Sequence, residues 1–443
     1  MTMVILQGRF QRLRGWGAVS STRTGFLFLV CWVFLYAAVP AQSLAAQGTA
    51  RLSLKVFPQE TQLVDVLSGQ ILEPDNRRDT WRDYILRTGS RLFELRSPGY
   101  HSKYITLHNL EAGTIREVDE KLEPLDSILP LRGELPTGSQ PKSVVFTPDG
   151  QYLLAAQLNG PGYDVYRTDP PEHLRRVAIP EWGRHRGFVE WAVLPQRGEI
   201  WLSQMTAGRV HVIDLDTLEP VSSFPTRGEW SKVITVDSRE QYAYVSNWLS
   251  EDISIVSVEE HRVIGHLAAS GTPRGMAINA EGTKLYAGIY EGDGIDVFDL
   301  TTGERIKTIP TGWGAKRHMV LDSAVNRLYI SDMYHGDIWV YDTSDETLVS
   351  RTDLAPKLNT IALSRDGRYL FVSSRGRNNP ESYLLKGPDF GTISVLDTRT
   401  MEVVGRVWGR NQPTGLALSP DGSLLATTDF LDHNLEFFQV DLP

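Results

Sequence analysis

The sequence has very little cysteine and an excess of acidic residues. Cys31 is the single cysteine among 443 residues, and it lies in an apolar segment near the start of the chain. A chain cleaved after that segment has no disulfide bond and no cysteine ligand for a metal. The 45 Lys and Arg against 54 Asp and Glu give a formal net charge of −9. This balance disfavours nucleic acid and anionic lipid as partners.

Long hydrophobic runs are also missing. The longest, GFLFLVCWVFLYAA at residues 25–38, is shorter than the roughly 20 residues that span a bilayer. Its upstream charges are all arginines, and small residues follow at Ser43, Ala45 and Ala46. This order is typical of a signal peptide. We expect residues 1–46 to be a cleaved signal peptide of a periplasmic, cell-surface or secreted protein. An uncleaved membrane anchor is the alternative.

The common signatures of catalytic and metal sites are absent from the sequence. It has no G-x-S-x-G nucleophile elbow. His318, Asp332 and His335 fall in one repeat unit, and Asp429 and His433 in another, without the spacing of a histidine metal motif. We therefore predict no metal and no cofactor, and a binding protein rather than an enzyme.

The sequence does contain a repeated unit, which is clearest in TPRGMAINAEGTKLYAGIYEGDGIDVFDLTTGERIKTIPTG at residues 272–312. Its four β-patterned runs, GMAIN, KLYAGI, IDVFDL and RIKTIP, are separated by turn residues. The apolar residue that opens the second strand recurs at Leu153, Ile200, Ala243, Leu285, Leu328, Leu370 and Leu425. The spacings of 47, 43, 42, 43, 42 and 55 residues suit propeller blades. The last is long because of an insertion. The sequence predicts seven units.

The first and last units are incomplete in complementary ways. ILPLRGELPTG at residues 128–138 reads as a fourth strand with no strands before it, and the last unit supplies only three strands. We expect residues 128–136 to become the outer strand of the last blade and so close the ring by hydrogen bonds. The predicted fold is all-β: a small β-sandwich over residues 50–126, then a seven-bladed β-propeller over residues 127–443.

The tandem pattern resembles a known repeat family. PTGLALSPDGSLLATT, the unit at residues 272–312 and RDGRYLFVSS…GTISVLDTRTMEVVGRV share the P-x-G-h-A opening, the P-D-G turn and the V-x-V-h-D third strand. They resemble the YVTN family of β-propeller repeats, which is found in bacterial envelope and secreted proteins. Related propellers include lactonases and the cofactor domains of oxidases. No motif in this sequence carries over their catalytic residues.

The segment before the repeats resembles a second family. Its runs RLSLKVF, TQLVDVL, SRLFELRS, KYITLHNL and TIREVDEKL alternate apolar and polar residues, as half-buried strands do. DTWRDYILRTGSRLFELRSPGYHSKYITLHNL at residues 79–110 resembles the second half of a PEGA domain, a small β-sandwich. The chain departs from that family at its name-giving tetrapeptide, where it has PQET at residues 58–61. An unrelated small sandwich is the alternative.

Alternate loops of a four-stranded blade lie on one face, so the loops before the first strand and after the second strand converge on the channel. Convergent polar groups at such a mouth are the default ligand site. The candidate residues are Lys142, Glu190, Lys232, Arg274, Arg317, His318, Tyr334, His335, Asp429 and His433. The alternative is that these loops are polar only because they are solvated.

An insertion, RGRNNPESYLLKGPDFG at residues 375–391, interrupts the repeat on the same face. Arg375 and Arg377 make it locally basic and Tyr383 offers an aromatic anchor, although long loops are also tolerated as plain surface insertions. We expect this face to bind a protein, peptide or glycan of the cell envelope. The alternative function is a lactonase-like or other hydrolase that uses His318, His335 or His433 at the channel mouth.

Overall fold

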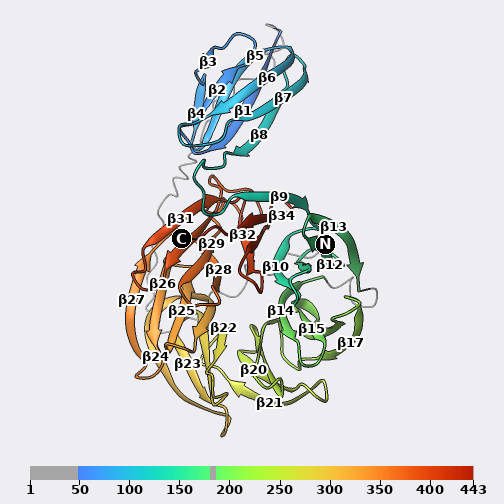
Figure 1. Ribbon diagram of the computed structural model, residues 1–443, viewed down its shortest axis with the longest axis vertical. Helices are drawn as coiled ribbons and strands as arrows, with labels where there is room; N and C mark the ends of the chain where they lie inside the picture. Colours follow the sequence, from blue (N-terminus) through green and yellow to red (C-terminus); the bar gives the residue numbers. More distant parts are fainter. Residues whose placement is uncertain (1–47, 180–185, 443) are drawn as a thin grey trace, which may run out of the picture.

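The structure is a computed structural model and describes residues 48–179 and 186–442. The predicted signal peptide lies outside the described residues. Figure 1 shows a small β-sandwich above a ring of sheets. The described residues form strands and one 3-10 helix, η3 (Met205–Ala207), and none of their helices has the length and apolarity to cross a membrane.

The sandwich consists of two four-stranded sheets, ordered β4-β5-β1-β8 and β3-β2-β6-β7. Their inner faces bury apolar side chains such as Leu52, Leu54, Phe93 and Leu107. The strands are β1 (Thr49–Phe57), β2 (Gln62–Asp65), β3 (Ile71–Leu72), β4 (Asn76–Arg78), β5 (Trp81–Arg87), β6 (Gly89–Arg96), β7 (Lys103–Leu110) and β8 (Ile115–Lys121).

One central strand of the sandwich, β5, does not follow the alternation from which strands are predicted. Arg82 and Asp83 are buried side by side with Tyr84. Asp83 accepts hydrogen bonds from Ser53 (2.6 Å) and Arg78 (2.9 Å), and Arg82 donates to the carbonyl of Thr61 (2.6 Å). Because these polar groups are paired inside the domain, the strand tolerates charge on both faces.

The ring consists of consecutive antiparallel sheets, with innermost strands at the centre (Figure 1). The sheets are β10–β13, β14–β17, β18–β21, a six-stranded sheet β22–β27, β28–β31, and β32-β33-β34-β9. Apolar residues of each sheet pack on the next, as Leu154 and Val165 do on Ile200 and Leu202. Stacking therefore buries faces that a single sheet leaves exposed.

The strand bounds of the ring follow in chain order. They are β9 (Leu131–Pro136), β10 (Pro141–Phe146), β11 (Tyr152–Gln157), β12 (Gly162–Thr168), β13 (Pro171–Ala178), β14 (Phe188–Leu194), β15 (Glu199–Gln204), β16 (Arg209–Asp214), β17 (Pro220–Pro225), β18 (Ser231–Val236), β19 (Tyr242–Asn247), β20 (Asp252–Ser257) and β21 (Arg262–Ala268). They continue with β22 (Pro273–Ile278), β23 (Lys284–Asp299), β24 (Glu304–Asp322), β25 (Arg327–Asp332), β26 (Asp337–Asp342), β27 (Thr347–Asp353), β28 (Leu358–Leu363), β29 (Tyr369–Ser374), β30 (Thr392–Asp397), β31 (Val403–Trp408), β32 (Pro413–Leu418), β33 (Leu424–Asp429) and β34 (Asn434–Gln439).

The six-stranded sheet differs from the separate units that the sequence predicts. β23 runs through the expected turn YEGDG without a break, and β24 joins the end of one unit to the first strand of the next. The two strands pair from Tyr290 with Ala315 to Asp299 with Glu304, with register shifts around Gly292. This extended pairing satisfies the backbone of the predicted turn, which therefore stays in the ladder.

The ring closes through the pairing that the sequence predicts. β9 lies antiparallel to β34, with Leu135 opposite Leu435 and Pro136 opposite Asn434. Beyond the strand, Thr137 N donates to His433 O (2.8 Å) and Gln439 N donates to Pro130 O (2.9 Å). The beginning and the end of the ring are therefore held together by backbone hydrogen bonds.

The sandwich sits on the rim of the ring near β9 and β31 (Figure 1), and buried lysines fix it there. Lys121 Nζ lies 2.5 Å from Glu436 Oε1 and donates to the carbonyl of Trp408 (2.6 Å). Lys55 Nζ donates to Asn411 Oδ1 (2.8 Å). Because both lysines are almost fully buried, the contact between the two parts is a desolvated, specific interface.

Candidate functional site

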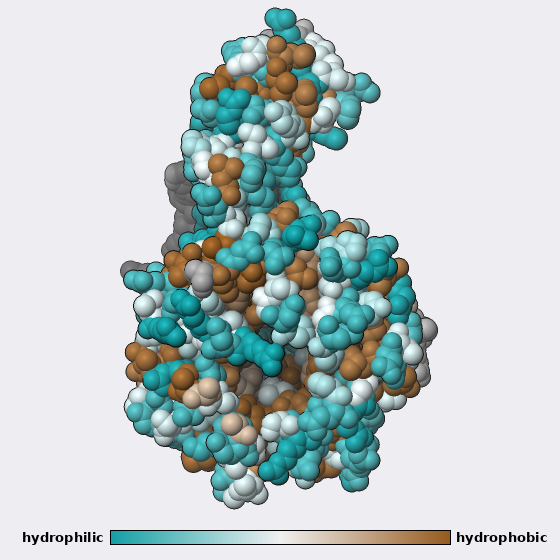
Figure 2. All heavy atoms as spheres, viewed as in Figure 1, coloured by the Kyte–Doolittle hydropathy of each residue, from teal (hydrophilic) through white to brown (hydrophobic). Residues whose placement is uncertain are grey.

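Each innermost strand of the ring has a register irregularity at the same place in its sheet. It falls at Lys142 in β10, at Arg317 in β24, and at the equivalent residues of β14, β18, β22, β28 and β32. A β-bulge of this kind inserts one residue and re-aims a side chain, and bulges are frequent beside functional sites. The bulges therefore direct one set of residues toward the centre of the ring, where Figure 2 shows a hollow.

Contacts across the channel show that this set converges. Glu190 belongs to the sheet of β14 and Arg274 to the sheet of β22, with the sheet of β18 between them in the chain. Nevertheless Arg274 Nη2 donates to Glu190 Oε1 at 2.6 Å, and Arg317 Nη1 lies 3.7 Å from the same oxygen. Arg274 is 1% exposed and Arg317 is 4% exposed. Three innermost strands, β14, β22 and β24, thus meet at one carboxylate.

Two lysines and a third arginine complete what we call the cation cluster: Lys142, Lys232, Arg274, Arg317 and Arg375, with Glu190. Their positive charges lie on aromatic rings. Lys232 Nζ is 3.1 Å from the centre of the Trp248 ring, and Lys142 Nζ is 5.3 Å from that of Phe430. The Arg375 guanidinium is 5.6 Å from the Tyr383 ring. Cation–π contacts of this kind stabilise charge without neutralising it.

The pKa values of the cluster follow from burial and mutual repulsion. Burial and the neighbouring arginines place the pKa values of Lys142 and Lys232 well below normal. Burial and Arg274 lower the pKa of Arg317 to about 9. Burial opposes the ionisation of Glu190, but Arg274 and Arg317 outweigh it and lower the pKa to about 2. The cluster therefore has one ionised carboxylate, and its basic side chains outnumber that carboxylate.

Several polar atoms of the cluster, and of His318 and Asn359 on the innermost strands β24 and β28, have no hydrogen-bond partner among the described residues. They are Nε and Nη1 of Arg274, Nη1 and Nη2 of Arg317, Nε of Arg375, Nδ1 of His318, and both side-chain polar atoms of Asn359. Burial lowers the pKa of His318 to about 4, so its imidazole is neutral near pH 7. Since buried polar groups are almost always paired in folded proteins, this set needs an explanation.

The other predicted mouth residues lie outside the cation cluster. His335 Nδ1 is 3.0 Å from Asp332 Oδ2, and Tyr334 is 54% exposed with its ring against Trp313. His433 Nδ1 accepts a hydrogen bond from Gln140 N (3.0 Å).

Asp429 belongs to the seam with the sandwich. Burial and the charge of Glu436 raise the pKa of Asp429, whereas Lys121 lowers it. Asp429 is the last residue of β33 rather than a loop residue, and Lys121 of the sandwich contributes to its electrostatic environment.

The insertion at residues 375–391 spans from the channel to the sandwich. Arg375, at its start, is 7% exposed and donates to Gln412 Oε1. Farther along, Lys386 Nζ lies 2.9 Å from Asp119 of the sandwich and 2.7 Å from Asp432. Arg377 pairs with Asp389 (2.6 Å). Much of the loop is thus occupied by contacts within the chain. The sequence could not show that Arg375 enters the channel. The sequence shows only that Arg375 directly follows the second strand of its unit.

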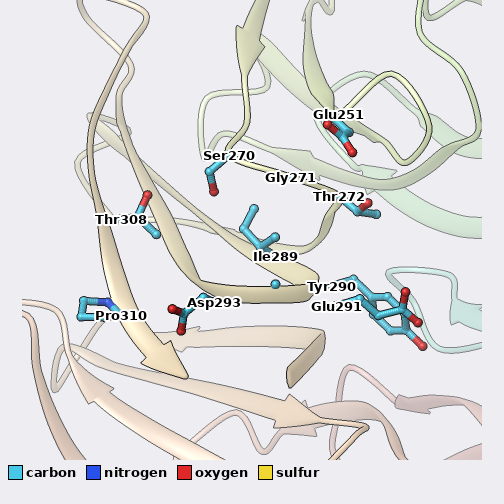
Figure 3. Close-up of a pocket in the computed structure, with 11 residues that line it drawn as sticks. Glu251, Ser270, Gly271, Thr272, Ile289, Tyr290, Glu291, Asp293, Thr308 and Pro310 are labelled. Carbon is cyan, nitrogen blue, oxygen red and sulfur yellow. The ribbon is translucent and has the colours of Figure 1, made fainter. Parts of the chain in front are cut away.

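A pocket of about 570 Å³ adjoins the channel (Figure 3). Its wall includes the carboxylates of Glu251, Glu291 and Asp293 and the ring of Tyr290. Tyr290 also packs on Trp248 at 4.7 Å between ring centres. Burial raises the pKa of Tyr290, and the charge of Arg317 opposes this effect. Tyr290 therefore separates an acidic pocket from the cation cluster.

Comparisons with known proteins agree with this architecture. The family model of the cytochrome D1 heme domain matches residues 200–387. 6-Phosphogluconolactonase of Yersinia pestis (strain Pestoides F) is 24% identical over 321 residues, which cover 67% of this chain and 90% of that enzyme. A solved chain of Kuenenia stuttgartiensis hydrazine synthase has a TM-score of 0.59 at 16% identity and covers 70% of this chain and 97% of that chain. The last likeness shows a shared propeller-type fold.

A fuller match identifies the family. Antigen Lp49 of Leptospira interrogans serogroup Icterohaemorrhagiae serovar copenhageni is 33% identical over 438 residues, which cover 94% of each chain. This match includes the segment before the ring as well as the ring itself. The chain therefore belongs to the same family as antigen Lp49, and its fold is all-β and of propeller type.

Proposed function

We propose that the protein is an exported, non-catalytic binding protein that takes an anionic ligand at the mouth of its channel. One observation carries this proposal: the guanidinium groups of Arg274 and Arg317 are buried and retain nitrogen atoms without hydrogen-bond partners among the described residues. Leaving a charged donor unsatisfied is costly in a folded protein. A ligand with acidic oxygens supplies the missing acceptors.

The proposed architecture has two parts. Residues 127–443 form seven YVTN-type blades, with β23 and β24 each contributing to two strand positions, and residues 50–126 form a PEGA-like sandwich. The sheet order, the bulge in each innermost strand and the pairing of β9 with β34 support this assignment.

The proposed location is the cell envelope, after removal of residues 1–46. In the cell envelope, the acidic groups of the ligand belong to a free molecule or to a protein, peptide or glycan partner.

A haem is one candidate ligand, since the cytochrome D1 heme domain model covers most of the cluster. The residues present fit the acidic edge of a haem, because Arg274, Arg317 and Lys232 are placed to hold its carboxylates. His318 offers a buried Nδ1 without a partner among the described residues. Bound haem would supply redox chemistry through its iron. The purified protein's visible spectrum tests this candidate directly.

A hydrolase is the second candidate function, because the likeness to 6-phosphogluconolactonase spans 90% of that enzyme. The name of that enzyme indicates a phosphorylated sugar lactone, and a phosphate suits the cation cluster. In this chain the neutral imidazole of His318 would activate water. Hydrolysis of 6-phosphogluconolactone that is lost in His318→Ala supports this candidate, and no hydrolysis above the uncatalysed rate removes it.

The proposed binding function is tested by titration calorimetry with citrate, and with glucose as a neutral comparison. We expect citrate to bind, glucose not to bind, and citrate affinity to fall about tenfold or more in Arg317→Met, since a hydrogen bond to a charged group contributes about 1.5–3 kcal/mol. Arg399→Met, at an exposed position, is the matched control and keeps wild-type affinity. Absence of any anion binding contradicts the proposal.

A further inference from the structure

The cation cluster has a charge imbalance that one simple anion does not correct. Its three arginines alone exceed the single carboxylate of Glu190 by two positive charges, and the excess becomes four when Lys142 and Lys232 are also protonated. Charges of like sign repel strongly inside a protein, where water screens them little. The imbalance is thus a property of the whole cluster rather than of any one residue.

Nothing else in the described part of the chain relieves this excess. Neither Lys142 nor Lys232 forms an ion pair with a described residue, and two other buried carboxylates of the ring have cations of their own. Asp332 is 3.4 Å from Lys316, and Glu436 is 2.5 Å from Lys121. Among the described residues, the counter-charge for the cluster is therefore missing.

We infer that the ligand is one compact molecule with three or four acidic groups, an oligophosphate or a polycarboxylate. This inference rests on the proposed function and names the ligand class of the same site. A single phosphate or carboxylate would leave most of the cluster unneutralised, whereas a polyanion matches it. Phosphate and carboxylate share the chemistry that guanidinium recognises, which is a pair of adjacent anionic oxygens.

The positions of the cations determine how the acidic groups are arranged. Lys142, Lys232, Arg274 and Arg317 come from four different innermost strands, β10, β18, β22 and β24, and Arg375 from the loop after β29. They therefore approach the channel from around the ring. A ligand with acidic groups on several sides of one body satisfies this arrangement better than a linear chain with a charge at one end.

The adjoining pocket repels such a ligand and so disfavours its binding outside the channel. Glu251, Glu291 and Asp293 give its lining three carboxylates and no basic residue. Repulsion from these groups keeps a polyanion on the channel side of Tyr290. The two neighbouring hollows therefore have opposite preferences, which favours one bound position.

Binding of a polyanion also takes up protons. Burial and the adjacent arginines suppress the ionisation of Lys142 and Lys232 in the free protein. A polyanion beside them favours their charged forms. This linkage gives a readout that is independent of affinity.

The experiment compares tripolyphosphate with orthophosphate, and butane-1,2,3,4-tetracarboxylate with butyrate, by titration calorimetry of the intact protein. We expect each polyanion to bind at least about 100-fold tighter than its single-charge counterpart, because each added charged contact is worth about tenfold. Measurement at pH 8 in buffers of different ionisation enthalpy should show net proton uptake. The tighter of the two polyanions indicates the natural source of the acidic groups.

Variants separate this inference from the general binding function. Lys232→Met and Lys142→Met each lower tripolyphosphate affinity by about tenfold and reduce proton uptake. Neither lysine has an ion-pair partner among the described residues, so neither variant leaves a buried carboxylate unpaired, and folding is preserved. Arg399→Met, at an exposed position, is the matched control and does not weaken binding. If single-charge and polyanionic probes bind equally well, the inference is wrong and the binding function stands. If no probe binds, both are wrong.

Discussion

Glu190 shows how one residue organises the cation cluster. Its carboxylate binds Arg274 at 2.6 Å and lies 3.7 Å from Arg317, and no other acidic residue belongs to the cluster in the part of the chain that the structure describes. Removing one partner of a buried ion pair usually costs more than the pair contributes, because the remaining charge stays desolvated. Loss of Glu190 should therefore reduce the stability of the protein by more than the loss of one ion pair, because two buried arginines lose their anion.

We predict that Glu190→Gln lowers the free energy of unfolding by about 3 kcal/mol, since it leaves Arg274 and Arg317 without an anion. Chemical denaturation at pH 7 measures the change. Glu172→Gln, which breaks only the exposed pair with Arg167, is the control and changes stability by less than about 0.5 kcal/mol. Equal stability of the two variants would contradict the prediction.

The same residue predicts a pH dependence. Arg274 and Arg317 overcome the effect of burial and lower the pKa of Glu190 from 4.5 to about 2. A carboxyl group whose pKa falls on folding stabilises the protein above its unfolded pKa, and this stabilisation is lost as pH falls through the folded pKa. The stability difference between wild type and Glu190→Gln should be constant above pH 5 and shrink toward pH 2. A stability difference between the two proteins that stays constant from pH 5 to pH 2 would contradict this prediction.

At the scale of the element, the innermost strands are packed closely because each is bulged. Gly415 in β32 has no room for a side chain: a Cβ atom there would lie 2.7 Å from Ser143 Cα in β10 and 2.8 Å from Thr428 Oγ1. The first of these is backbone, which cannot rotate away. Close approach of β32 and β10 therefore requires glycine at this position.

We predict that Gly415→Ala destabilises the ring by about 1–3 kcal/mol through this clash. Thermal unfolding followed by circular dichroism measures the effect. Gly265→Ala, in the outer strand β21, is the control: its Cβ would lie at an ordinary 3.5 Å from Ile255 Cδ1, so it should be neutral or slightly stabilising. Similar unfolding temperatures for both variants would refute the packing argument.

The sequence predicts strands and closure better than it predicts sites, and the reason lies in how local each signal is. Alternation and turn residues are local, so β7 and the pairing partner β9 are predicted correctly. Bulges depend on register with a neighbouring strand, and they decide that Arg274 and Arg317 meet at Glu190. The position of Arg375 depends on a loop that is held by the sandwich. Neither the register of the bulges nor this contact between domains can be read from a short window of sequence.

At the scale of the whole molecule, the sandwich contacts the ring through the aromatic ring of Phe57, which packs on Phe390 and Trp408, and through buried charged side chains. Lys121 is central, since its ammonium lies between Glu436 (2.5 Å) and Glu123 (3.4 Å). Burial raises the pKa of Glu436, and Lys121 opposes this effect. Loss of the lysine leaves buried carboxylates without a cation, and separation of the two parts is the way to hydrate them.

We predict that Lys121→Gln releases the sandwich from the ring while each part remains folded. Small-angle scattering should show a larger radius of gyration, and protease should cleave between β8 and β9 faster. Arg96→Gln, which breaks only the exposed pair with Glu94 inside the sandwich, is the control and should match wild type. An unchanged scattering profile for Lys121→Gln would show that other contacts suffice.

The donated strand β9 has a consequence for biosynthesis. Glu134 and Asn434, which bond across the seam, are 300 residues apart, so the ribosome completes β9 long before its partner strand exists. Throughout that interval the growing chain carries an unsatisfied strand edge, the type of surface on which nascent proteins associate wrongly. A message truncated before codon 434 therefore yields a product that is left permanently open, whereas a chain that includes β34 can pair it with β9 and close the ring.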